Sequence, residues 1–364
     1  RSKSITAPLM LPRLKTLSLQ TEFAALPTAV TLAVKKDNFE VAMNFKLFEQ
    51  PGGDRPYSAL IMLLTGVFLI AFQDSLVKLR SVHTSFWQFQ SLRSAGNIGF
   101  LLIFALAGSG LGILLPRNTR AVYFRAAMLT ICMFCFFAGA PYLTVAQMAA
   151  GLYTYPLFVS LLAAPLLGEK VGRWRIAALL LGSIGASLVL SPWDDDFSSI
   201  QILPIVAGFF YAANIITLKR ACRNESPMAL AFAVGLVYLV SGLVGIMILS
   251  LFPLSDNIRE TLPFVAIGWP TLTLVVAAFA LLTSVLNLGG NICMSRAYQS
   301  ADASWLAPLD FSYLLFAAIW SRVIFDQWPT QQALAGMSLI AFAGIVTAWR
   351  EQLAARRHRR IALK

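Results

Sequence analysis

The chain has few charged residues and almost no histidine, and these shortages limit the classes of protein to which it can belong. Charged residues make up 13% of its 364 positions, against about 25% in soluble proteins. The two histidines, His83 and His358, lie far apart, and no GxSxG or HExxH motif is present. An enzyme that uses a clustered catalytic site is therefore disfavoured. No GxxxxGKS/T loop is present either, so coupling to ATP would need a partner protein.

Cysteine is also scarce. Cys132, Cys135, Cys222 and Cys293 all fall in or beside apolar stretches, which indicates no disulfide framework. The Cys132-x-x-Cys135 pair has no neighbouring histidine or carboxylate, so two small apolar side chains explain it better than a metal site. We expect no metal and no other cofactor.

Long apolar runs dominate what is present. Hydrophobic residues make up 58% of the chain, and the 24 positions from Val145 to Gly168 carry no charge. At ~1.5 Å per residue such a helix crosses ~30 Å of hydrocarbon. The sequence predicts an all-α polytopic membrane protein. We expect ten spans at about 57–77, 86–108, 121–140, 145–167, 173–191, 199–218, 228–252, 270–293, 303–325 and 331–349.

The positive charges indicate an orientation. With the N-terminus in the cytoplasm, 24 of the 29 lysines and arginines fall on the inner side and four on the outer side. This excess is the positive-inside pattern of a membrane protein, and it explains the net charge of +12 better than nucleic-acid binding. Both termini are predicted to be cytoplasmic. We expect residues 1–56 to form a disordered extension and residues 350–364 a basic tail that contacts anionic lipid.

The two halves of the chain repeat each other weakly. An offset of 157 aligns Leu157 with Leu314 and Glu169 with Asp326, and an offset of 142 aligns Gly66 with Gly208. The extra 15 residues of the second half fall most simply between 252 and 269. Two registers that keep the order of the spans indicate an internal duplication, with repeats at 57–191 and 199–349. Because five spans per repeat is an odd number, the two repeats are inverted in the membrane.

Two segments of the chain, one at the end of each repeat, resemble the EamA branch of the drug/metabolite transporter superfamily. The segment TYPLFVSLLAAPLLGEKVGRWRIAALLLGSIGASLVL is similar to the family's fourth and fifth helices, and the end of the chain is similar to its ninth and tenth. The matching residues are Pro156, Leu157, Phe158, Gly168, Glu169, Gly182 and Gly185, then Ala297, Pro308, Tyr313, Gly336 and Gly344, and Arg93 in the second span. Asp326 departs from the family's usual glutamate, and Ser321-Arg322 stands where small apolar residues are usual.

The resemblance implies ten helices in two inverted repeats around a central cavity, and secondary transport of small organic metabolites. Pro156 and Pro308 occupy mid-span positions in the two halves. A proline removes one helical hydrogen bond, and helix breaks at matching places often mark a transporter's binding site. A packing kink is the plainer alternative for each proline.

Ionisable residues inside spans are the other candidates, because a charge at mid-bilayer costs at least ~2.5 kcal/mol. Asp310 could bind a cationic group or take a proton, with Tyr313 on the same helix face. Arg93 could hold a carboxylate or phosphate. The plainer alternative is that Asp310 and Arg93 pair with each other. Asp74, near the end of its span, is expected to snorkel outward or to pair with Lys78.

Polar and aromatic side chains at mid-span are either helix–helix contacts or cavity residues. The predicted set is Gln147, Tyr153, Tyr155, Tyr211, Asn214, Asn287, Asn291 and Trp305, with Glu169 and Asp326 as acids of the repeat turns.

Together these features predict a secondary carrier in the inner (plasma) membrane, driven by a proton or exchange gradient and acting by alternating access. Its expected partners are a small-molecule substrate and lipid, without nucleic acid, and its expected state is a monomer or homodimer. The alternatives are an intramembrane enzyme and a transport-inactive scaffold or sensor.

Overall fold

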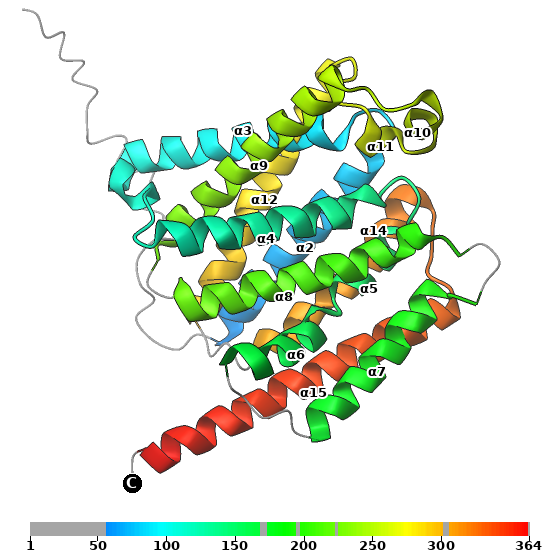
Figure 1. Cartoon of the computed structure of the whole chain (residues 1–364). Helices are drawn as coiled ribbons and strands as arrows, with labels where there is room; N and C mark the ends of the chain where they lie inside the picture. The colour runs from blue at the N-terminus through cyan, green and yellow to red at the C-terminus, as the bar shows by residue number, and fades with distance from the viewer. Residues whose placement is uncertain (1–55, 168–172, 194–196, 223–224, 301–305, 363–364) are drawn as a thin grey trace, which may run out of the picture. The chain divides into compact units, whose positions relative to one another are not determined.

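In the computed structural model, residues 56–167, 173–193, 197–222, 225–300 and 306–362 are described. All regular elements in these ranges are helices, and six of them are long and apolar enough to cross a membrane. Two shorter apolar helices, Ile176–Leu190 and Gln331–Val346, accompany them. Figure 1 shows these helices packed side by side. The chain is a multi-pass membrane protein, and the expected extension at 1–56 lies almost wholly outside the described residues.

Most of the predicted spans correspond to one helix each, and two are divided. In chain order they are α2 (Pro56–Arg80), α3 (Phe86–Phe104), η1 (Ala105–Ser109), η2 (Leu111–Leu114), α4 (Thr119–Ala138), α5 (Val145–Leu152), α6 (Tyr155–Leu167), α7 (Arg173–Leu190), η3 (Ser199–Ile202), α8 (Leu203–Ala221), α9 (Pro227–Leu251), α10 (Asp256–Thr261), α11 (Pro263–Ala266), α12 (Leu274–Ser300), η4 (Ala307–Phe311), α14 (Ser312–Phe325) and α15 (Gln331–Ala362).

Short polar side chains set where several helices begin. The Ser85 hydroxyl accepts a hydrogen bond from the Gln88 amide at the start of α3, and Asn118 accepts one from the Ala121 amide at the start of α4. Ser226 does the same ahead of α9, with Pro227 as its first residue. Each cap satisfies a backbone donor that a helix start would otherwise leave free.

The predicted single helix over 145–167 is wrong. The chain forms α5 and α6 with a break at Tyr153 and Thr154, and the Thr154 hydroxyl donates to the Gly151 carbonyl at 2.6 Å. Pro156 is the second residue of α6, a position where the missing N–H has no partner within the helix. The proline thus begins a new helix instead of kinking a continuous one.

The ninth predicted span is also divided. Pro308 lies in the 3-10 helix η4, and the α-helix α14 begins only at Ser312. Two candidates, Glu169 and Trp305, lie outside the described residues. At the other end of α14, Asp326 adopts a left-handed conformation as the C-cap and forms an exposed ion pair of 2.5 Å with Arg322.

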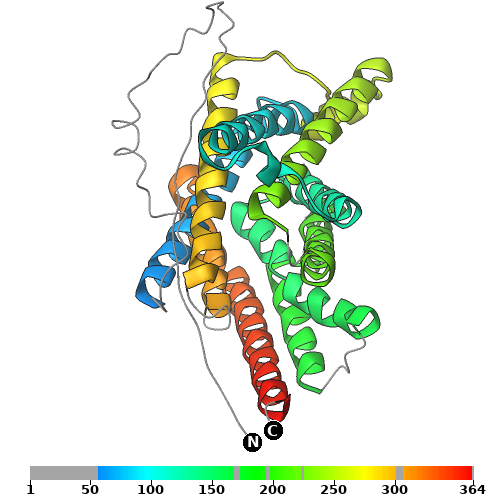
Figure 2. The same cartoon turned by 90° about the vertical axis from the view of Figure 1, so that its left-hand side faces the viewer.

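Four helix pairs make the most extensive contacts: α2 with α12, α3 with α9, α4 with α8, and α7 with α15. Glycines bring two of these pairs close together. A Cβ on Gly66 of α2 would lie 2.8 Å from the Gly290 carbonyl of α12, and one on Gly185 of α7 would lie 2.7 Å from the Gly336 carbonyl of α15. In Figure 2, α12 (yellow) passes in front of α2 (blue), with which it makes extensive contacts. The predicted close packing at Gly185 and Gly336 is confirmed.

The segment expected to hold the extra residues of the second half contains α10 and α11. It packs on the start of α3, where the Ser85 hydroxyl donates to the Gly268 carbonyl at 2.7 Å and the Trp87 indole donates to the Val265 carbonyl at 2.8 Å. At the other end of the chain, α15 continues as one helix through the predicted basic tail to Ala362.

Candidate functional site

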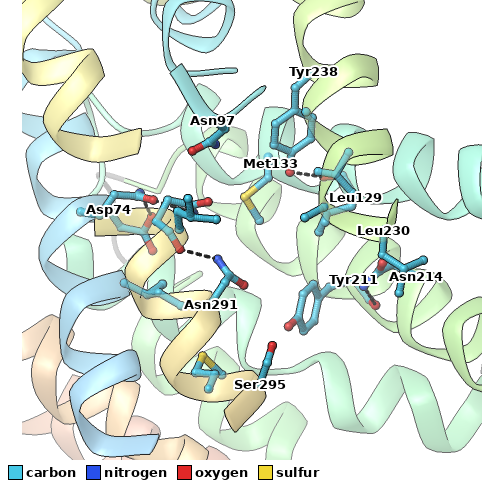
Figure 3. A pocket seen from close by; sticks show the side chains of 18 of the residues that line it. Asp74, Asn97, Leu129, Met133, Tyr211, Asn214, Leu230, Tyr238, Asn291 and Ser295 are labelled. Atoms are coloured by element: carbon cyan, nitrogen blue, oxygen red, sulfur yellow. Dashed lines mark hydrogen bonds between the residues drawn. The ribbon is translucent and has the colours of Figure 1, made fainter. Parts of the chain in front are cut away.

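A cavity of about 540 Å³ lies among the helices. One wall is formed by α2 and α12, the opposite wall by α4, α8 and α9, and the breaks before α6 and α14 contribute Tyr153 and Asp310. Figure 3 shows Asp74 and Asn291 on one side and Tyr211, Asn214 and Tyr238 on the other. Four charged side chains line it: Asp74, Arg93, Arg125 and Asp310.

A chain of hydrogen bonds runs along the wall of α2 and α12 and ends on Asp74. The Asn287 amide donates to Gln73 at 2.9 Å, and the Gln73 amide donates to one oxygen of Asp74 at 2.6 Å. The Tyr313 hydroxyl donates to the other oxygen at 2.5 Å. Both carboxylate oxygens of Asp74 therefore accept a hydrogen bond from a buried side chain. The Asn291 amide donates to the Asn287 carbonyl at 2.8 Å, so these two residues share a face as predicted.

The prediction for Asp74 is therefore wrong. Asp74 is buried, and it neither snorkels outward nor pairs with Lys78. The Lys78 ammonium donates instead to the Ala140 carbonyl at 2.8 Å and lies 5.1 Å from the centre of the Phe325 ring. Sequence reasoning missed Asp74 because an aspartate near the end of a span can either line a cavity or contact water at the membrane surface. Its partner Tyr313 lies 239 positions away.

Asp310 lines the cavity, as predicted, through different contacts. The Tyr155 hydroxyl donates to one carboxylate oxygen at 3.4 Å, and the Tyr153 hydroxyl donates to the Asp310 backbone carbonyl at 3.2 Å. The other carboxylate oxygen is buried without a hydrogen-bond partner. Tyr313, expected to share a face with Asp310, bonds to Asp74 instead. Asp310 lies in the 3-10 helix η4 and Tyr313 in the following α-helix α14, so the two residues do not share one regular helix.

Tyrosine rings link the surroundings of the two aspartates. Tyr153 stacks on Tyr313 with ring centres 5.0 Å apart and planes 11° apart. Tyr153 also meets Tyr155 edge-to-face at 5.7 Å, and Tyr155 meets Tyr211 at 4.9 Å. Such pairs contribute about 0.5–1.5 kcal/mol each beyond area burial. The cluster holds the two breaks in a fixed relation to each other.

Arg93 is almost fully buried, with 3% of its surface exposed. Its guanidinium donates to the Gln90 side chain at 2.8 Å and lies 5.6 Å from the centre of the Phe137 ring. The Nε atom has no partner. The alternative of an ion pair between Arg93 and Asp310 is not found, and Asp74 is the carboxylate whose charge acts on Arg93.

Helices α3, α4 and α8 present polar atoms without partners at the cavity. The side-chain oxygens of Asn97 and Asn214 and the Nε atom of Arg125 are buried and unbonded. Buried polar atoms are bonded in the great majority of cases, so these atoms are exceptions. Sequence reasoning found Asn214 but missed Asn97. It assigned Arg125 to the inner loop, because an arginine within two turns of a helix start is difficult to distinguish from a loop residue by sequence.

One predicted residue lies elsewhere. Gln147 forms a capping box with Thr144 at the start of α5. It lines a separate pocket of about 200 Å³, which also contains Ser191, Gln201 and Trp328. A polar residue at a helix start serves the backbone first, so Gln147 is not part of the central cavity.

Comparisons with known proteins agree with this architecture. Residues 57–191 match the model of the EamA-like transporter family. A riboflavin transporter of Vibrio cholerae is 30% identical over 59% of this chain and 66% of its own length, just under two thirds. A riboflavin transporter of Rhizobium johnstonii is 26% identical over 79% and 89%. A pseudopaline exporter of Pseudomonas aeruginosa is 24% identical over 79% and 95%.

A solved crystal structure shares the fold, with a TM-score of 0.53 and 17% identity over 83% of this chain and 99% of its own. The relatives are transporters, as the resemblance implied. Residues 57–191 belong to the EamA-like transporter family, and the relatives named as transporters support membership of the drug/metabolite transporter superfamily.

Proposed function

We propose that this protein is a secondary active transporter that moves a small organic metabolite across the inner membrane by alternating access. The observation that carries the proposal is the polar cavity inside an apolar helical bundle, lined by Asp74, Arg93, Arg125 and Asp310. Charges within a membrane protein are costly unless they serve a pathway or a binding site. A cavity of this size accommodates a ligand of small-metabolite dimensions.

The helix pairing supports an arrangement of two inverted five-helix repeats, at 57–191 and 199–349. In this arrangement α2 of the first repeat corresponds to α8 of the second, and α4 corresponds to α12. The α2–α12 pair therefore corresponds to the α8–α4 pair, and both pairs are among those with the most extensive contacts. The same correspondence leaves the α3–α9 and α7–α15 pairs unchanged. It also superposes the break before α6 on the break before α14. Both are places where transporters of this build bind their substrates.

The extent of the cavity supports an inward-open state. Its lining reaches Leu218, Pro227 and Ser295, close to the ends of α8, α9 and α12 that the positive charges assign to the cytoplasm. Toward the other face, the Asp74–Tyr313 hydrogen bond and the Lys78–Ala140 hydrogen bond join the helices. Alternating access then requires these outer contacts to open while the inner ends close.

Asp310 is our candidate for the coupling site. Its unpartnered oxygen lies beside the break before α14, where a proton or a cationic group of the substrate can reach it. If Tyr153 and Tyr155 move during transport, the hydrogen bonds of Asp310 change with them. Exchange of one metabolite for another would use the same cavity without a proton.

Reconstituted transport tests the proposal. Proteoliposomes containing the full chain are screened for uptake and exchange of riboflavin first, because two relatives carry that name, and then of other small metabolites. We expect accumulation or exchange that Asp310→Asn reduces at least about tenfold while folding is kept. The control Asp256→Asn removes an exposed carboxylate and should leave transport unchanged.

Vectorial movement separates the rival functions. Chemical turnover of a compound without accumulation inside the vesicles would favour the enzyme and contradict the carrier. A folded protein that moves no compound of a broad metabolite library would favour the scaffold or sensor.

A further inference from the structure

Arg125 is a cavity residue whose charge is not balanced by any carboxylate among the described residues. It lies six positions after the start of α4, and its half-buried side chain lines the central cavity. Its Nε atom is buried and makes no hydrogen bond. Burial removes water from the Nε–H group of the guanidinium, which costs free energy. A hydrogen bond to an acceptor would offset that cost.

The charged and polar groups around Arg125 do not supply that acceptor. Those that act on its charge most strongly are the Tyr211 and Tyr238 hydroxyls and the Cys222 thiol. Burial raises the pKa of Cys222, which lies beyond the end of α8, and the Arg125 charge opposes that rise. The thiol therefore stays neutral and provides no negative charge near neutral pH.

The nearby acidic residue is already used. The two carboxylate oxygens of Glu225 accept hydrogen bonds from the Arg117 and Asn118 amides at 2.9 and 2.7 Å, where they satisfy the start of α4. Arg93 differs from Arg125, because it faces the charge of Asp74. Of the two cavity arginines that the structure describes, Arg125 is therefore the one that is free to bind an anionic group of a ligand.

We propose that Arg125 is a specificity-determining residue that binds an anionic group, a carboxylate or a phosphate, of the transported molecule. This rests on the proposed transport function and adds a substrate class to it. A guanidinium binds such groups through two parallel hydrogen bonds. Figure 3 shows the Tyr211 ring projecting into the cavity toward Ser295, so its hydroxyl is a further donor for the same group. The sequence alone assigned Arg125 to membrane orientation.

Matched ligand pairs test the role of Arg125 while the natural substrate is still unidentified. Binding to the full chain in an uncharged sugar detergent is measured by calorimetry. The pairs are riboflavin with riboflavin 5′-phosphate, and tryptophanamide with tryptophan; in each pair the second member carries the anionic group. We expect at least one anionic member to bind about tenfold tighter than its partner, a difference of about 1.4 kcal/mol.

The variants decide whether Arg125 causes the preference. Arg125→Gln should reduce the ratio of affinities to about one while the member without the anionic group binds as before, and Arg125→Lys should keep part of the ratio. Arg120→Gln is the control, because it removes the same charge from an exposed position of the same helix. Equal or weaker binding of both anionic members, or an unchanged ratio in Arg125→Gln, overturns the proposal.

Two further arms separate substrate binding by Arg125 from lipid binding and from the transport function itself. If added phosphatidylglycerol abolishes the ratio, the arginine binds a lipid headgroup and its role toward the substrate is overturned. If the ratio depends on Arg125 but no vesicle uptake occurs, the anion site stands and the transport function fails. If vesicles take up a metabolite but the ratio of affinities is the same in Arg125→Gln as in the unaltered protein, transport stands and the anion site fails.

Discussion

The Tyr313 hydroxyl on α14 donates a 2.5 Å hydrogen bond to the Asp74 carboxylate on α2. This bond joins the first span to the ninth across the cavity wall, and Gln73 supplies a second donor to the same carboxylate. A hydrogen bond to a charged group contributes about 1.5–3 kcal/mol. In the proposed alternating-access mechanism, this hydrogen bond is one of the contacts that must open on the outer side of the cavity.

Removing this hydroxyl should destabilise the fold. In Tyr313→Phe the carboxylate keeps its bond to Gln73 but loses its shortest one, and we expect a loss of about 1–3 kcal/mol. The thermal unfolding midpoint in detergent should fall by several degrees. The control Tyr57→Phe removes a hydroxyl from a ring that is 83% exposed and should leave the midpoint unchanged. Equal midpoints for both variants would show that the bond contributes nothing.

Two adjacent glycines of α12 should respond differently to alanine. A Cβ on Gly290 would lie 2.7 Å from the Ile70 side chain and 3.0 Å from the Gly66 carbonyl, whereas one on Gly289 would find its nearest atom at 3.9 Å. Gly290→Ala should cost about 1–3 kcal/mol through overpacking. Gly289→Ala should be neutral or stabilising by up to about 1 kcal/mol, because alanine favours helix. Midpoints that shift together would contradict the close contact of α2 and α12.

The break between α5 and α6 should survive removal of its proline. Pro156 lies in the first turn of α6, so Pro156→Ala restores no internal hydrogen bond that the present structure lacks, and we expect a change below about 1 kcal/mol. Gly208→Ala should cost more, because its Cβ would lie 2.9 Å from the Thr154 hydroxyl and 3.0 Å from the Leu152 carbonyl at the break. Thermal unfolding midpoints in detergent measure both changes. A large loss in Pro156→Ala, with Gly208→Ala unaffected, would assign the break to the proline itself.

The proposed orientation predicts opposite labelling of two loop positions. Cysteine at Arg120 should react with a membrane-impermeant maleimide only after the membrane is opened, whereas cysteine at Asp256 should react in intact cells. Both positions are exposed. The unaltered protein provides the background, since Cys132, Cys135 and Cys222 are buried. Labelling of Arg120→Cys in intact cells would reverse the topology.

The sequence by itself determined that the chain is an all-helical multi-pass membrane protein, because apolar length is a property of each segment alone. It also selected as candidates several residues that line the cavity, since a polar residue inside an apolar run is visible without neighbours: Asp310, Arg93, Tyr153, Tyr155, Asn214, Asn287 and Asn291. Periodicity could not reveal the divided fourth helix, because the break depends on a Thr154 hydrogen bond and on the close approach of Gly208.

Only the tertiary structure decided which polar groups meet. Asp74 and Tyr313 are 239 positions apart, and no local pattern records that contact. Arg125 reads as an orientation charge in the sequence, and its place in the cavity follows from how α4 packs against α8 and α9. Hydrophobicity selects a segment for the membrane one span at a time, whereas a binding site arises from the packing of several spans together.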